Sequence, residues 1–164
     1  MVNRARQGRV LRPACGVVLG ILLVGGTGCA QEKSAPAEPR MQRGLPSAKV
    51  LRLHQLSVPS GARHVAYARD DGWSSYGLAL TFRVPERRLD GFLRAARVPK
   101  SALRQGYFLG DVATEQTGWK KRAGRSYVKG SSPGTRASAP RHDVTVDMTD
   151  RPREVTVYVT SVRG

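Results

Sequence analysis

The sequence predicts an α+β fold, in which an antiparallel sheet of four to five strands is covered by one main helix. Two observations lead to this prediction. Strand-like alternation of apolar and polar residues occurs in two regions, residues 64–84 and 143–160, each long enough for a β-hairpin. One amphipathic helical pattern lies between them, at residues 85–97. The order ββ-α-loop-ββ indicates a two-layer sandwich, because the apolar face of such a sheet needs a cover.

The first hairpin is expected from residues 64–69 and 76–84. The second of these strands has the clearest pattern in the chain, because its apolar side chains recur at period two. They are Tyr76, Leu78, Leu80, Phe82 and Val84. Asp70-Asp71-Gly72 suits the turn, since Asp and Gly tolerate positive φ. A weaker strand is expected upstream at residues 50–56, where the alternation is imperfect.

The main helix is expected to begin at Pro85-Glu86. Proline fits the first helical turn, and an acid there complements the helix dipole. Apolar residues follow at i, i+3, i+4 and i+7, which gives the helix one apolar face. These residues are Leu89, Phe92, Leu93 and Ala96. Pro99 ends the helix. A further helical turn is expected at residues 101–105, and a short strand at 107–112.

The second hairpin is expected from residues 143–149 and 155–160, which are rich in β-branched side chains. Before it, residues 117–141 form a long basic loop, in which one strand is allowed at residues 126–129. A loop of this length inside a compact domain is either functional or disordered.

The N-terminal region predicts a destination for the protein. A basic stretch with four arginines precedes an apolar run, which is typical of an export signal. The run ends in small residues directly before Cys29. This order resembles a bacterial lipoprotein signal with its lipobox, although Gly26 stands where the usual pattern has a larger aliphatic residue. With the Pro/Ala-rich stretch that follows, the chain resembles the small lipoproteins of high-GC Gram-positive bacteria.

That resemblance implies that Cys29 is acylated and becomes the first residue of the mature chain. The protein would then be anchored to the outer face of the cell membrane. Ordinary secretion and an uncleaved membrane helix are the alternatives. A spanning helix needs about 20 apolar residues, and this run is shorter and contains five glycines.

The expected domain organisation has three parts. Residues 1–28 form the signal peptide, and residues 29–47 form a lipidated, disordered tether. Three prolines and little apolar bulk prevent this tether from burying enough surface to fold. Residues 48–164 form a single α+β domain, which is of usual domain size.

Composition narrows the possible functions. The two cysteines are Cys15, inside the predicted signal, and Cys29, the predicted site of the lipid. The domain therefore has no thiol for a metal site or a nucleophile. The full chain has a net charge of +16, and removal of the four signal arginines leaves +12. Outside the cytoplasm the nearest polyanions are lipid headgroups and wall polymers that bear phosphate or carboxylate, so nucleic acid is the less favoured partner.

No motif in the domain specifies a reaction, a cofactor or a metal. The histidines lack metal-ligand spacing; they are His54, His64 and His142. Residues 126–129 match S-x-x-K, but the companion motifs of that enzyme class are missing. Three acids offer oxygen ligands to a cation, Asp143, Asp147 and Asp150. The alternation places Asp143 and Asp147 on the solvent side of their strand, so we assign no metal site and no catalytic residue.

The basic loop is the stretch most suited to binding. It contains no acid, and aromatic residues are interleaved with its bases. The candidate polyanion- or membrane-contacting residues are Trp119, Lys120, Lys121, Arg122, Arg125, Tyr127 and Lys129. Each base near an anionic surface adds about 1 kcal/mol, and Trp and Tyr suit the headgroup region. The alternative is a solvated, mobile loop without a binding role.

The sequence therefore predicts a membrane-tethered extracytoplasmic protein with a non-enzymatic binding or envelope-associated role. Its expected partners are the membrane through the lipid anchor, and anionic lipids, wall polymers or an envelope protein. The alternative is a small envelope hydrolase or cell-wall-modifying enzyme, with a site assembled from His64, His142 and scattered carboxylates. A histidine beside a carboxylate in a closed pocket would favour the enzyme.

Overall fold

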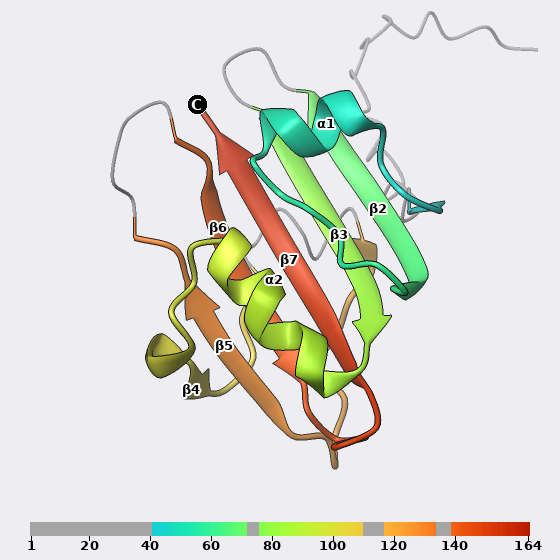
Figure 1. The fold of residues 1–164 in the computed structure, drawn as a ribbon, viewed down its shortest axis with the longest axis vertical. Coiled ribbons are helices and arrows are strands. Elements are labelled where there is room, and N and C mark those ends of the chain that lie inside the picture. The colour runs from blue at the N-terminus through green and yellow to red at the C-terminus, as the bar shows by residue number, and fades with distance from the viewer. Residues whose placement is uncertain (1–40, 72–75, 110–116, 134–138) are drawn as a thin grey trace, which may run out of the picture. The chain divides into compact units, whose positions relative to one another are not determined.

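The computed structural model of the protein describes residues 41–71, 76–109, 117–133 and 139–164. The predicted signal peptide, Cys29 and the first part of the predicted tether lie outside these residues. The described chain has an α+β fold with a seven-stranded sheet in the order β1-β2-β3-β7-β6-β5-β4. All neighbouring strands are antiparallel. Two helices lie across the same face of the sheet (Figure 1).

The strands are β1 (Gln42–Arg43), β2 (Arg63–Asp71), β3 (Tyr76–Val84), β4 (Arg104–Gln105), β5 (Tyr127–Ser131), β6 (Arg141–Asp147) and β7 (Val155–Arg163). The helices are α1 (Ala48–Leu53) and α2 (Leu89–Ala95), and the 3₁₀ turns are η1 (Glu86–Arg88) and η2 (Lys100–Ala102). Within the described residues, no helix is both long and apolar enough to cross a bilayer.

The structure confirms the predicted α+β class, but the sheet is larger than the four to five strands expected. Part of the difference is two short edge strands, β1 and β4, each two residues long. Segments this short contain too few residues to show an alternating pattern. Gln42 and Arg43 of β1 pair with Tyr67 and Ala66 of β2. The sheet therefore begins inside the range predicted as tether.

Both predicted hairpins are present, as the pairs β2–β3 and β6–β7. They meet where β3 pairs with β7, in a register that runs from Tyr76 opposite Arg163 to Val84 opposite Val155. Because each hairpin supplies one central strand, their apolar faces form one continuous surface. Phe82, Val157 and Val159 on this surface are completely buried.

Helix α2 covers this surface as its sequence pattern predicts. Leu89, Phe92 and Leu93 are buried between the helix and the sheet. The ring of Phe92 meets the ring of Phe82 edge to face, with 5.0 Å between centroids. This geometry is the preferred one for aromatic pairs and adds to the stabilisation from burial.

The strand predicted at residues 50–56 is wrong, because the chain forms helix α1 there. Ser47 caps the helix: its Oγ accepts a hydrogen bond from the Val50 main-chain N–H at 3.4 Å. Val50 and His54 lie four residues apart, and both are buried. The imperfect alternation in this stretch therefore reflects helical i, i+4 spacing.

The face of the sheet opposite the helices is called the second face below. The predicted alternation in β6 is correct, but the expected exposure of Asp147 to solvent is wrong. Thr145 is 0% exposed and Asp147 is 3% exposed. Residues 107–109 contact this face, because the Thr145 hydroxyl donates to the Phe108 carbonyl and accepts from the Phe108 N–H. Residues 107–109 are not in a strand, and the rest of the predicted strand at 107–112 lies outside the described residues.

Candidate functional site

Residues 117–125 form the most basic ordered stretch of the predicted loop, and we call them the basic segment. Its first contact with the second face is made by Trp119. The Trp119 ring meets the Tyr158 ring of β7 edge to face, with 5.2 Å between centroids. The Trp119 N–H donates to the Thr117 Oγ1 at 3.2 Å, and Thr117 is itself buried. The segment is thus held at its N-terminal end by an aromatic contact and a local turn.

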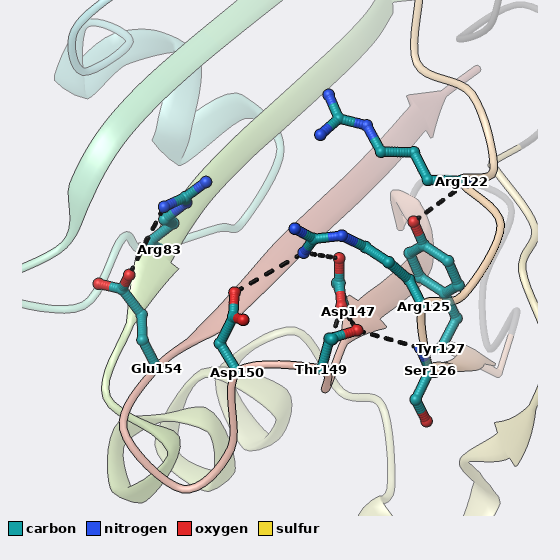
Figure 2. Close-up of polar contacts among 9 residues, drawn as sticks. All are labelled: Arg83, Arg122, Arg125, Ser126, Tyr127, Asp147, Thr149, Asp150 and Glu154. Carbon is teal, nitrogen blue, oxygen red and sulfur yellow. Dashed lines mark hydrogen bonds and ion pairs between the residues drawn. The ribbon is translucent and has the colours of Figure 1, made fainter.

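The second contact lies in the middle of the segment. The main-chain N–H of Arg122 donates to the Tyr127 Oη at 3.4 Å (Figure 2). Tyr127 is 4% exposed, and its ring meets the Tyr107 ring edge to face at 5.0 Å. Burial raises the pKa of Tyr107 to about 12. The buried Tyr127 therefore holds the backbone of the basic segment through its hydroxyl group, while the charged side chains stay outside.

The third contact is an ion pair between Arg125 and Asp147. The Arg125 Nη1 lies 2.7 Å from the Asp147 Oδ2 and 3.7 Å from the Asp150 Oδ2 (Figure 2). The other oxygen of Asp147 accepts from Thr149, from its N–H at 3.0 Å and from its hydroxyl at 2.6 Å. Each carboxylate oxygen of this buried side chain thus has a partner, which is the condition for burying a charge at acceptable cost.

The pKa of Asp147 shows that these contacts outweigh burial. Burial by itself raises the pKa of this carboxyl group. The hydrogen bonds from Thr149 and the Arg125 guanidinium lower the pKa by more than burial raises it. The pKa of Asp147 therefore lies below its ordinary value. Asp147 is therefore a carboxylate at neutral pH, and it holds Arg125 against the sheet.

Between these contacts the segment presents three consecutive exposed cations, Lys120, Lys121 and Arg122. In the described part of the chain, none of the three forms an ion pair with a carboxylate. Figure 2 shows the Arg122 guanidinium lying apart from the Arg125–Asp147 pair. The arrangement is a short row of free positive charges on an anchored backbone.

The structure separates the predicted contact residues into two groups. Trp119, Arg125 and Tyr127 are engaged by the sheet, so they position the segment. Lys120, Lys121 and Arg122 are free to meet a ligand. Lys129 lies on strand β5, with its Nζ 5.7 Å from the centroid of the Phe108 ring. The remaining predicted residue, Cys29, lies outside the described residues.

A second polar cluster, which the sequence analysis did not identify, lies on the helix side of the sheet. The Ser161 Oγ of β7 is 2.9 Å from the His54 Nδ1 and 3.0 Å from the His142 Nδ1. All three residues are at most 2% exposed. The serine hydroxyl has one proton, so it can donate to at most one of the two rings. At least one of the two neutral rings therefore carries its proton on Nδ1 and donates it to the serine oxygen.

Serine and histidine are side-chain types that occur in nucleophilic catalysis, but a substrate cannot reach a cluster that is buried in this way. The Ser161 side chain is 1% exposed, and the hydrogen-bond partner of each histidine in the cluster is a hydroxyl group and not a carboxylate. His64 is exposed and lies outside the cluster. No group of three metal-binding side chains occurs among the residues that the structure describes. The cluster instead ties the end of α1 to β6 and β7.

The sequence did contain a signal for this cluster. The alternation of β7 continues from Val159 to Ser161, and that of β6 extends back from Val144 to His142. Extending each pattern by two residues places a polar side chain at a core position. Two such positions on paired strands predict a buried polar contact, because a buried polar group requires a partner.

The histidine cluster predicts a loss of stability in mild acid. Burial lowers the pKa of His54 to about 4, assisted by the nearby cations Arg163 and Arg69, while Asp71 opposes the shift. Burial likewise lowers the pKa of His142 to about 4, assisted by His54 and Arg97 and opposed by Asp143. In the unfolded chain each ring binds a proton near pH 6.5, whereas in the folded protein it does so only near pH 4. The free energy of unfolding is therefore highest above pH 6.5 and falls as the pH drops toward 4.

We expect the free energy of unfolding in urea to fall by about 2 kcal/mol per histidine between about pH 6.5 and pH 5. His54→Gln/His142→Gln removes both titrating groups and should flatten the profile in this window. His64→Gln is the matched control, because this exposed histidine lies outside the cluster, and it should keep the full dependence. A wild-type profile that is flat in this window contradicts the assignment.

Comparisons of the chain with protein-family models, with curated proteins and with solved structures find no match.

Proposed function

We propose that the protein is a lipid-anchored extracytoplasmic module that binds anionic polymers of the cell envelope through its basic segment. The observation that carries this proposal is the row of three exposed, unpaired cations on a backbone fixed at three points. Ordering a flexible cationic loop on binding would cost conformational entropy. In this protein the fold has already met much of that cost, because Trp119, Tyr127 and Asp147 hold the segment in place.

The internal charge balance supports an external anion. Eight ion pairs engage every carboxylate of the described residues except Asp70. Among the described residues, little negative charge is left to neutralise the free bases, and the whole chain carries a net charge of +16. A protein with such an excess attracts polyanions and loses that attraction as salt screens it.

The aromatic contacts favour a polymer over a bilayer as the ligand of this segment. Insertion into the headgroup region requires aromatic rings that are free to leave the protein. Tyr127 is buried, and the Trp119 ring packs against Tyr158. The cations are therefore the part of the segment that reaches the ligand, and phosphate or carboxylate groups along a wall polymer are their proposed partners.

Binding should depend on the position of the three cations and not only on net charge. We expect Lys120→Gln/Lys121→Gln/Arg122→Gln to lose about 3 kcal/mol of binding free energy to poly(glycerol phosphate), roughly a hundredfold in affinity. The measurement is isothermal titration of the full chain carrying Cys29→Ser, at low ionic strength. The polymer supplies regularly spaced phosphate groups without a lipid surface.

The matched control removes three exposed cations from the helices, Lys49→Gln/Arg52→Gln/Arg94→Gln. It has the same net charge as the first variant, so long-range attraction falls equally in both. We expect the control to retain most of the affinity. Equal losses in the two variants would show that the basic segment has no special role. Binding of the same proteins to vesicles of phosphatidylglycerol, at an affinity above that for the polymer, would favour the membrane as the ligand.

The proposed anchor makes an independent prediction about Cys29. We expect mass spectrometry of the mature protein to find an acylated cysteine at its N-terminus, and the protein to fractionate with membranes. Cys29→Ser removes the thiol that would carry the lipid, so the protein should move to the soluble fraction or retain its signal. A mature chain that starts elsewhere, with Cys29 unmodified, would refute the anchor and leave polymer binding to be judged separately.

A further inference from the structure

A hollow at the β4 edge of the sheet has the features of an anion site. It has a volume of about 370 Å³ and is lined by Ala102, Arg104, Phe108, Lys129, Gly130 and Ser131. The hollow is formed by η2, by the paired strands β4 and β5, and by the chain that follows β4. It is therefore separate from the basic segment, although Lys129 of β5 belongs to the same predicted loop.

Two cations face each other across this edge. Arg104 of β4 is the direct partner of Lys129 of β5, so their side chains leave the sheet on the same side. Like charges directly opposite each other on paired strands destabilise the pairing. Within the described chain neither residue forms an ion pair with a carboxylate. The Arg104 Nη1 instead donates to the Ser101 and Leu103 carbonyls, at 2.6 and 3.0 Å.

The Lys129 side chain runs close to the backbone at Gly106. Gly106 has φ +139°, and a Cβ added there would lie 3.2 Å from the Lys129 Cε and 3.6 Å from its Cδ. The aliphatic part of the Lys129 side chain thus occupies the space that the Cβ of any other residue at position 106 would need. The ammonium group at its end lies 5.7 Å from the centroid of the Phe108 ring.

The main chain of Phe108 is held by hydrogen bonds, although the residue is exposed. Its main-chain N–H donates to the Thr145 Oγ1 at 3.2 Å, and its carbonyl accepts from the same hydroxyl. Its side chain is nevertheless 43% exposed, which makes it one of the few exposed large apolar residues in the described chain. Charged side chains often protect edge strands from pairing with other chains, but that role does not require a lysine beside an exposed aromatic ring.

We propose that this hollow binds one anionic group, a phosphate or a carboxylate, between Arg104 and Lys129, while the adjoining apolar part of the ligand lies on the Phe108 ring. A bound anion would relieve the repulsion between the two cations. Because this repulsion destabilises the free protein, its relief adds to the binding free energy. Arg104 has donors left for a planar or tetrahedral oxyanion, because the guanidinium carries five N–H groups. The site does not depend on the basic segment.

The test is an NMR titration of the full chain carrying Cys29→Ser, with inorganic phosphate and with acetate in separate series. Sodium chloride keeps the ionic strength constant, so a general salt effect is the same at every point. We expect saturable shifts of the amide signals of Gly106, Phe108 and Gly130 with at least one anion. Saturation by phosphate alone identifies a phosphate ligand, and saturation by acetate alone identifies a carboxylate ligand.

Two variants make the result decisive. Arg104→Gln/Lys129→Gln should weaken the apparent affinity at least tenfold, with the amide signals of β3 unchanged as evidence of an intact fold. Lys120→Gln/Lys121→Gln/Arg122→Gln should leave the titration as in the wild type, so failure of the polymer-binding proposal is distinguishable from failure of this one. Shifts that grow linearly without saturation, or saturable shifts that survive in the Arg104/Lys129 variant, would overturn the site.

Discussion

The pairing of β3 with β7 is the constraint on which the rest of the structure depends. An isolated two-stranded hairpin is at best marginally stable in water, and the long hairpins β2–β3 and β6–β7 come from different halves of the described chain. The β3–β7 register, from Tyr76 opposite Arg163 to Val84 opposite Val155, combines them into a single sheet. One face of that sheet becomes the core under α1 and α2, and the other receives the basic segment (Figure 1). A slip of one residue in this register would exchange the two faces of β7.

The second face explains how a basic stretch is ordered in a protein with few acids. Asp147 is buried there, and Arg125 is the cation that compensates it. A buried carboxylate without a partner would be costly, whereas a paired one fixes the position of the chain that carries the partner. The aromatic contacts of Trp119 and Tyr127 supply the apolar part of the same attachment. One base, Arg125, thus anchors the segment, whereas Lys120, Lys121 and Arg122 form no ion pair among the described residues.

The sequence predicts those features that rest on local patterns. Strand β3 and helix α2 have strict periodicities, and both lie where the patterns place them. The patterns cannot show that β3 pairs with β7, because that contact joins residues about 80 positions apart. They also miss α1, whose short amphipathic stretch passes for a strand, and the burial of Asp147, which depends on a cover from another segment. The basic loop was identified by charge, but the division of its residues into anchors and free cations required the fold.

Lys120, Lys121 and Arg122 are proposed to form a preorganised polyanion-binding row. Hydrogen–deuterium exchange of the full chain, with and without poly(glycerol phosphate), is the experiment that tests this proposal. The amides of Trp119 and Arg122 should already exchange slowly without polymer, since they donate to the Thr117 Oγ1 and the Tyr127 Oη. Polymer should slow them further, while exchange in α2 stays unchanged. Fast exchange of these two amides in the free protein, or polymer protection confined to other elements, would contradict a preorganised row of cations.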